Sequence, residues 1–300
     1  MAAVLGLAGC VSARPAAHPS GTSPAPPGTE VVDLATRSGA WPASQHLFDA
    51  AVSRLAHRCL AAHGFNDPDV AQPPLPSPQD EAAAIDMPAR RRHGYGLIPD
   101  SSGSSSAPPQ DPYYAQLSPQ DKQRFDTALF GPATDTVSVD VGGGQTVGTR
   151  GQGCEADARR TIAGDLAVWA RIFYAPDQYA NRLSEQASQS PAYLGAVALW
   201  RSCMADRGYR YQTPDGAYNA MRDLYRQAGA TPRFRQEQIA VAVAVADGEC
   251  AGHAHLPSTA LAVQRSLVAA LPAADRAALA QLVSRRDQAV RRAAAVMGIP

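Results

Sequence analysis

The cysteines are the residues best suited to chemistry, and the chain has five of them. Two begin the same short pattern of a cysteine, four further residues, a glycine and an aromatic residue, at Cys59–Phe65 and Cys203–Tyr209. The residues before each cysteine follow a helical pattern, and glycine tolerates the left-handed turn that ends a helix. We therefore expect each cysteine in the last turn of a helix, where it can be tied to another element. The pattern favours a scaffold role over a catalytic one.

The cysteine nearest the amino terminus, Cys10, ends the sequence Leu-Ala-Gly-Cys, which has the pattern of a bacterial lipobox. In that motif, small residues admit the signal peptidase and the cysteine thiol takes a diacylglyceryl group. No basic segment precedes the motif and the apolar run before it is short, which a start codon placed too late or a truncated chain would explain. The alternative is an apolar amino terminus on a cytosolic protein.

The segment after Cys10, residues 11–42, is rich in Pro, Ser, Gly, Thr and Ala. Such a composition buries too little apolar surface to fold, so the segment is predicted to be a disordered tether. A lipobox followed by a tether predicts a lipid-anchored protein on the outer face of the cell membrane, with residues 1–10 as its signal segment and residues 43–300 as its folded part.

Four cysteines remain if Cys10 is lipidated: Cys59, Cys154, Cys203 and Cys250. An even number of cysteines in an exported protein predicts two disulfides, and three pairings are possible. Helix directions favour one of them. If three helices at 191–207, 214–228 and 232–252 run up, down and up, the carboxyl ends of the first and third lie together. Cys203 then pairs with Cys250, which leaves Cys59 to pair with Cys154.

A metal site is the alternative reading of the last cysteine. Cys250, His253 and His255 group one thiol and two imidazoles, which zinc or copper would accept as ligands. No Cys-x-x-Cys pair accompanies them, and histidines also suit the carboxyl ends of helices. The preferred interpretation therefore has no metal or other cofactor.

Composition and motifs exclude several classes of function. The 27 basic and 27 acidic residues cancel, which argues against a nucleic-acid partner. The sequence contains no His-Glu-x-x-His or Gly-x-Ser-x-Gly motif, and its one lysine, Lys122, belongs neither to a Walker A motif nor to a Ser-x-x-Lys pair. Acidic pairs such as Glu155 with Asp157, or Asp177 with Glu185, are expected by chance among 27 acids. We therefore predict a non-enzymatic protein that binds a protein or cell-wall partner. The alternative is an envelope hydrolase or a metal-handling protein that uses a site near Cys250–His255.

The elements that must position these residues are mainly helices. Helix starts are marked by Ser or Thr followed by Pro, at Ser118, Ser190, Thr213 and Thr231. They predict a helix at 119–130 and the three helices named above. Apolar stripes predict further helices at 44–63, at 154–173 with a connecting helix near 177–186, and in the tail, where Arg285, Arg286, Arg291 and Arg292 are expected in solvent. Alternating valines around Gly142–Gly144 predict one hairpin at 136–149.

The stretch 66–112 holds ten of the 25 prolines and is predicted to be a long excursion from the folded part, with a short helix near 79–85. Its charge cluster, Arg90–Arg92, is interpreted as a solvated loop face, with contact to anionic lipid head groups or wall polymer as the alternative. The expected fold is a mainly α, disulfide-stapled multi-helix bundle with one small β-hairpin.

The motifs together resemble a known group of proteins. The lipobox, the Pro-rich tether, the repeated Cys-x4-Gly-aromatic pattern, Arg-Arg-x-Gly-Tyr-Gly at 91–96, Gly-Cys-Glu-Ala at 153–156 and Val-Ala-Asp before Cys250 are similar to uncharacterised secreted lipoproteins of actinobacteria. The resemblance covers most of 41–252. It implies the envelope location and the disulfide scaffold, and because that group has no established activity, it implies no functional residue.

Overall fold

The computed structural model describes residues 26–66, 84–97, 112–226 and 232–299, and 75% of the structure is helical. Two strands, β1 (Thr136–Gly142) and β2 (Gln145–Arg150), form the one sheet in the described part. The mainly α fold with one small hairpin is therefore confirmed. The helices are α1 (Thr29–Thr36), α2 (Trp41–Ala62), α4 (Met87–His93), α5 (Pro112–Gln116), α6 (Pro119–Phe130), α7 (Cys154–Ala163), α8 (Leu166–Ser188), α9 (Pro191–Asp206), α10 (Pro214–Arg226), α11 (Arg233–His253), α12 (Leu256–Leu267) and α13 (Ala273–Met297).

Three of the four predicted Ser-Pro or Thr-Pro helix starts are N-caps in the structure. The side-chain oxygens of Ser118, Ser190 and Thr213 each accept a hydrogen bond from the backbone N–H three residues later, at 3.1, 3.2 and 3.0 Å. Each bond satisfies one of the N–H groups that a helix start leaves without a partner. The fourth residue, Thr231, lies outside the described residues, although α11 begins two residues after it.

The hairpin forms where it was predicted. Val139 pairs with Val147 in an antiparallel register, and Gly143 and Gly144 turn the chain with positive φ angles of 59° and 76°. On one face, Val139 and Val141 are buried against Ala170 of α8. This contact fixes the hairpin turn beside the middle of α8.

The predicted tether is shorter than expected. The structure contradicts the prediction for residues 29–42, because α1 and the start of α2 are helical, and Leu34 and Ala35 are buried with Leu183 and Leu279. The Pro-rich composition ends at Pro27, and the apolar residues that follow it pack on α8 and α13. Residues 1–25, with the lipobox and Cys10, lie outside the described residues.

The helix predicted at 154–173 is two helices. α7 ends at Gly164, where φ is 96°, and Asp165 caps the start of α8 by accepting a hydrogen bond from the Val168 N–H at 2.7 Å. The next predicted break is also wrong, because α8 continues through Pro176 to Ser188.

The excursion at 66–112 contains the described helix α4, and α5 begins at its last residue, Pro112. Most of the short helix predicted near 79–85 falls outside the described residues, as do 67–83 and 98–111. α4 packs against α11, so part of the excursion belongs to the folded body.

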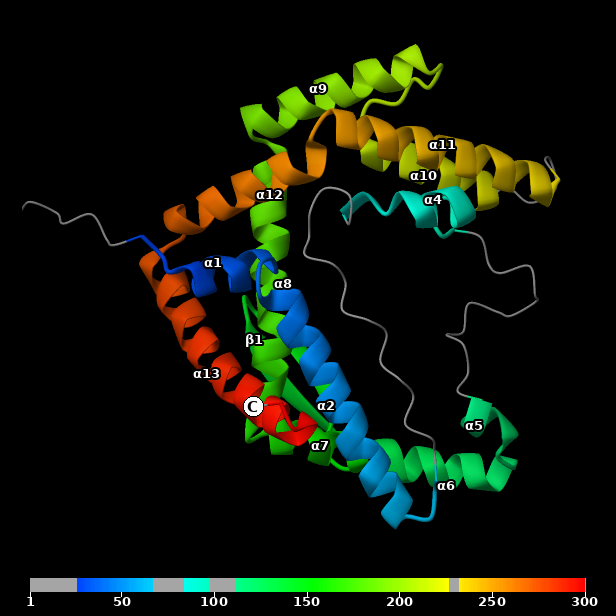
Figure 1. Ribbon diagram of the computed structural model, residues 1–300. Helices are drawn as coiled ribbons and strands as arrows, with labels where there is room; N and C mark the ends of the chain where they lie inside the picture. Colours follow the sequence, from blue (N-terminus) through cyan, green and yellow to red (C-terminus); the bar gives the residue numbers. More distant parts are fainter. Residues whose placement is uncertain (1–25, 67–83, 98–111, 227–231, 300) are drawn as a thin grey trace, which may run out of the picture.

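The helices form two groups that α8 and α12 connect (Figure 1). In one group, α4, α9, α10 and α11 surround Trp200 with the first residues of α12. In the other, α2, α7, α8 and α13 enclose Phe48 and Trp169, and smaller clusters lie beneath α1, α6 and the hairpin. The stretch predicted as a single domain thus has several separate cores among its described residues.

Both predicted disulfides are present. Cys59 is bonded to Cys154 and Cys203 to Cys250, with Cα atoms 5.5 and 5.6 Å apart. The first joins the end of α2 to the start of α7, and the second joins α9 to α11. Among the described residues, no single helix is both long and apolar enough to cross a membrane. The bent pair 256–270 and 273–297 meets that criterion jointly, across a bend of 110°.

Candidate functional site

A cleft of about 840 Å³ lies between the hairpin, α8 and α13. Its walls come from three distant stretches of the chain, 140–147, 171–182 and 275–285. The buried contact of β1 with α8 and the packing of α13 on α8 hold these stretches in place. Its polar lining consists mainly of arginines, aspartates and tyrosines: Arg171, Arg182, Arg285, Asp140, Asp177, Asp275, Tyr174 and Tyr179.

The aspartates on α8 and α13 already have cationic partners. Arg37, at the end of α1, binds Asp177 at 3.1 Å, and Arg182 binds Asp275 at 3.1 Å. Arg171 donates to the backbone oxygen of Asp140 at 3.0 Å and so fastens α8 to the hairpin. The two ion pairs neutralise the Asp177 and Asp275 carboxylates, and the lining as a whole contains three arginines and three aspartates.

Arg285 is the cation in the cleft that is available to a ligand. It is exposed on α13, and it makes no hydrogen bond or ion pair with another described residue. On the opposite wall, the buried amide nitrogen of Gln178 has no hydrogen-bond partner within the described part of the chain. The guanidinium can donate hydrogen bonds to an acceptor that enters the cleft, whereas the amide nitrogen is enclosed by protein.

Tyr179, on α8, adds a further hydrogen-bond donor to the cleft. Burial, and secondarily the Asp275 carboxylate, raises the pKa of its phenol above the usual value of 10, so it keeps its proton at neutral pH. The cleft therefore presents hydrogen-bond donors, aromatic rings and apolar side chains such as Leu282. This combination suits a ligand with carboxylate groups and flat or ring-shaped apolar surfaces.

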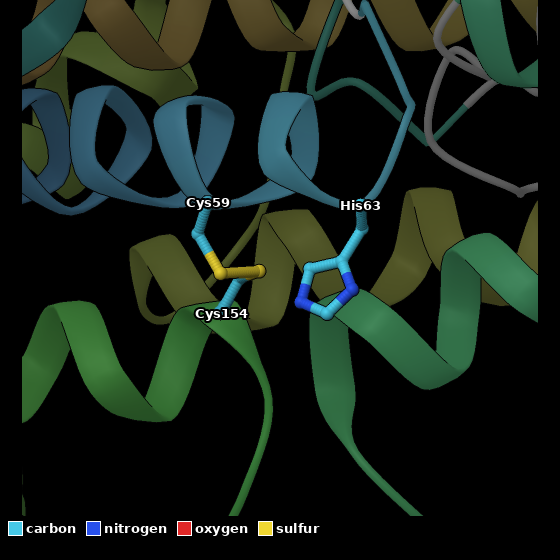
Figure 2. A group of neighbouring side chains, drawn as sticks. All are labelled: Cys59, His63 and Cys154. Carbon is cyan, nitrogen blue, oxygen red and sulfur yellow. A yellow bond between two sulfur atoms is a disulfide. The ribbon is translucent and has the colours of Figure 1, made fainter.

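The metal set considered at Cys250, His253 and His255 is not assembled in the structure. Cys250 is fully buried and bonded to Cys203, so its sulfur is not a thiolate, while both histidines are exposed. In the described part of the chain, metal-ligand spacing groups Cys59, His63 and Cys154, whose ligand atoms lie within 4.8 Å of one another (Figure 2). Their two sulfurs are also bonded to each other, which leaves one imidazole and no thiolate for a metal.

Three of the acidic residues considered as possible acid–base pairs contact arginines in the structure. Glu155 is bound to Arg159 at 2.5 Å, and Asp157 is bound to Arg160 at 2.7 Å. Asp177 is bound to Arg37, as described above. The structure thus assigns these carboxylates to ion pairs that surround the start of α7 and the cleft.

The cluster Arg90–Arg92 was wrongly interpreted as solvated throughout. Arg90 turns inward from α4 and binds the buried carboxylate of Asp247 at 2.6 Å, while Arg91 and Arg92 are exposed. The second oxygen of Asp247 accepts a hydrogen bond from the Trp200 indole at 2.9 Å. Arg90 also donates to the backbone oxygen of Ala244 at 3.0 Å. This network joins α4, α9 and α11 beside the Cys203–Cys250 bond.

The cleft was not predicted from the sequence, because the residues that line it form no motif. The one local feature of the sequence at the cleft is the run of glycines at 142–144, and by itself this run predicts only a hairpin turn. Gly143 lies so close to Gln178 that any side chain there would collide with the amide. The arginines on α8 and α13 resemble an ordinary solvated face in the sequence, and only the fold brings them together.

Comparison with known proteins gives no match to a protein-family model, a curated protein or a solved structure. Function is therefore inferred from the geometry of the cleft and from the sequence patterns.

Proposed function

We propose that this chain is a lipoprotein, held on the outer face of the cell membrane through Cys10, with a non-enzymatic binding role. Its ligand is a cell-wall fragment that carries carboxylate groups, and the cleft between the hairpin, α8 and α13 binds it. The lipobox sequence at 7–10 and the resemblance to secreted lipoproteins support the location. The observation that carries the binding role is the cleft itself, with Arg285 free to pair.

The chemistry of the cleft favours this ligand class. Arginine binds carboxylates through two parallel N–H donors, which gives both affinity and orientation. The tyrosines Tyr174 and Tyr179 supply flat apolar surfaces, against which sugar rings pack, and polar tips that donate hydrogen bonds. Peptide-bearing glycans of the cell wall combine ring-shaped surfaces with carboxylates, and they are abundant at the proposed location.

A binding role is favoured over the hydrolase alternative because two of the three carboxylates that line the cleft are held in ion pairs. Asp177 and Asp275 are bound by Arg37 and Arg182. A hydrolase needs one carboxyl group that can give up a proton and another group that can accept one. Carboxylates that balance arginines instead position those arginines, as a binding site requires.

The binding proposal is tested by titrating the full chain, kept soluble by Cys10→Ser, with soluble muropeptides in a calorimeter. Arg285→Ala should weaken binding about tenfold, because one charge-assisted hydrogen-bonding group is lost. Arg291→Ala is the matched control, since Arg291 is exposed on the same helix outside the cleft. Absence of binding, or an equal loss in both variants, would overturn the proposal. Cleavage of the muropeptide during the titration would instead support the hydrolase.

The location is tested separately by the intact mass of the membrane-extracted protein. A chain that starts at Cys10 and carries a diacylglyceryl group is expected, and Cys10→Ser should release the protein from the membrane fraction. An unmodified Cys10 in an exported chain would contradict the anchor and leave the binding proposal intact.

A further inference from the structure

The Cys59–Cys154 disulfide lies beside a histidine (Figure 2). Cys59 is in the last turn of α2 and is partly exposed, whereas Cys154 is the first residue of α7 and is 1% exposed. His63 follows α2 directly, and its ring turns back toward the two sulfurs. The imidazole nitrogen and both sulfurs lie within 4.8 Å of one another. One sulfur of this bond is thus accessible, and the other is held inside.

Thiol–disulfide exchange needs an accessible sulfur to attack and a leaving sulfur that carries negative charge well. Cys59 provides the accessible sulfur. Cys154 would leave as a thiolate at the amino end of α7, where the helix dipole and the free N–H groups stabilise an anion. The two acids in the first turn of that helix, Glu155 and Asp157, are each bound by an arginine, which offsets their repulsion of the thiolate. An imidazole beside the bond can donate a hydrogen bond to the departing sulfur.

The second disulfide also joins a partly exposed cysteine, Cys203, to a buried one, Cys250, but it lacks the helix amino terminus and the histidine. Cys203 and Cys250 both lie near the carboxyl ends of their helices, α9 and α11, where the dipole disfavours a thiolate. Cys250 is fully buried, and no histidine in the described residues groups with this pair. The two bonds therefore differ in the properties that control exchange, within the same protein.

A surface depression adjoins His63, although neither cysteine lines it. It has a volume of about 500 Å³ and is lined by His63, Phe65 and residues of α6 such as Gln123 and Arg124. His63 is therefore shared between the depression and the disulfide. A reducing group that enters the depression meets the imidazole before it meets the sulfurs.

We propose that Cys59–Cys154 is a thiol–disulfide exchange site for an external dithiol, and that Cys203–Cys250 is a structural bond. A thiolate of the dithiol attacks the Cys59 sulfur, forms a mixed disulfide and expels Cys154 as a thiolate, which His63 assists. The second thiol of the reagent then attacks the mixed disulfide and releases Cys59. The chain gains two electrons and two protons as a pair of thiols, and the dithiol is oxidised to its disulfide.

The test is to expose the folded full chain to dithiothreitol, trap free thiols with an alkylating reagent at intervals, and identify the labelled cysteines by peptide mass spectrometry. Cys59 and Cys154 should become labelled about tenfold faster than Cys203 and Cys250, since a stabilised leaving thiolate accelerates exchange. Equal rates for the two bonds, or opening of either only when the whole chain unfolds, would overturn the proposal.

Two histidine variants separate a chemical role of His63 from a structural one. His63→Gln should slow the opening of Cys59–Cys154 about threefold, because its amide assists the leaving sulfur less well, and should leave Cys203–Cys250 unchanged. His253→Gln is the matched control, because His253 lies three residues after Cys250 but does not group with the sulfurs. It should change neither rate. If His63→Gln opened both bonds at the wild-type rates, the role of the imidazole would be refuted.

Discussion

Arg286 of α13 donates a hydrogen bond to the backbone oxygen of Ile172 in α8, at 3.0 Å. In a regular helix, that oxygen would accept the N–H of residue 176, but residue 176 is a proline and has none. Pro176 is fully buried, so solvent does not replace the missing donor. The guanidinium of Arg286 thus fills the gap that the proline leaves in α8, and the helix continues to Ser188.

Burying the charged guanidinium of Arg286 is energetically unfavourable, and several contacts offset this cost. Burial lowers the pKa of its guanidinium well below the usual value, to about 9, which means that the charged form is disfavoured there. Ser44 accepts a hydrogen bond at 2.8 Å, and the Trp41 ring lies 3.7 Å from the guanidinium carbon. The interpretation of Arg286 as a solvated arginine is therefore wrong.

Arg286→Met should lower the free energy of unfolding by about 2 kcal/mol, because it leaves the buried Ile172 oxygen without a partner. In a Pro176→Ala background, the same substitution should cost less, since the N–H of the new alanine can bond to that oxygen. Urea unfolding of the four proteins in this double-mutant cycle measures the difference. Equal costs in both backgrounds would show that the carbonyl does not depend on Arg286.

The contact between Arg286 and the helix around Pro176 also shows which parts of the fold the sequence could predict. The caps at Ser118, Ser190 and Thr213, the valine hairpin and the two cysteine pairs depend on neighbouring residues or on helix direction, and the structure confirms them. The continuation of α8 past Pro176 depends on Arg286, which is 110 residues further along the chain. No local pattern carries that information, so the sequence predicted a separate connecting helix near 177–186 in place of one continuous helix.

The candidate site was less predictable for the same reason. The arginines of the cleft are spaced like an exposed helix face, and Arg90 belongs to a run of three arginines that is typical of a solvated loop. Only Arg90 finds a buried carboxylate, because α4 packs on α11. Whether a charged residue faces solvent, a cleft or a core depends on long-range packing, which composition and spacing do not specify.

Asp247 is expected to be a major source of stability in the group of helices around Trp200. Asp247→Ala would leave the Arg90 guanidinium and the Trp200 indole without their buried partner, and should lower the free energy of unfolding by about 3 kcal/mol. The control is Asp223→Ala, which removes an exposed carboxylate 3.9 Å from Arg222 and should change stability by less than about 0.5 kcal/mol. Urea unfolding followed by tryptophan fluorescence would compare them. A similar effect of both substitutions would contradict a structural role for the network.

Tyr95 makes the stability of the same region depend on alkaline pH. Burial, and then the nearby Asp247 carboxylate, raises the pKa of Tyr95 well above its usual value of 10. Above pH 10 the unfolded chain loses the Tyr95 proton while the folded chain keeps it, so the free energy of unfolding falls as pH rises. In Tyr95→Phe, this fall should be shallower by up to about 1.4 kcal/mol per pH unit. Urea unfolding between pH 9 and 11 measures both slopes, and identical slopes would refute the assignment.

Gly153 is the glycine at which a side chain should be least tolerated. Its φ is 95°, and an added Cβ would lie 2.6 Å from the Leu129 backbone oxygen, where α6 ends against the start of α7. Gly144, in the hairpin turn, also has a positive φ, of 76°, but its Cβ would meet open space. It therefore provides a comparison with a positive φ and no collision.

Gly144→Ala should cost about 1–2 kcal/mol for its positive φ, and Gly153→Ala should cost about 1–3 kcal/mol more, for the collision and for a backbone (φ 95°, ψ 165°) that essentially only glycine adopts. The additional cost arises because the α6 backbone has to move away from Cys154, which is already tied to Cys59. Thermal unfolding of the two variants compares the costs directly. If the Gly153 variant were no less stable than the Gly144 variant, the close packing of α6 on α7 would not be a constraint on this fold.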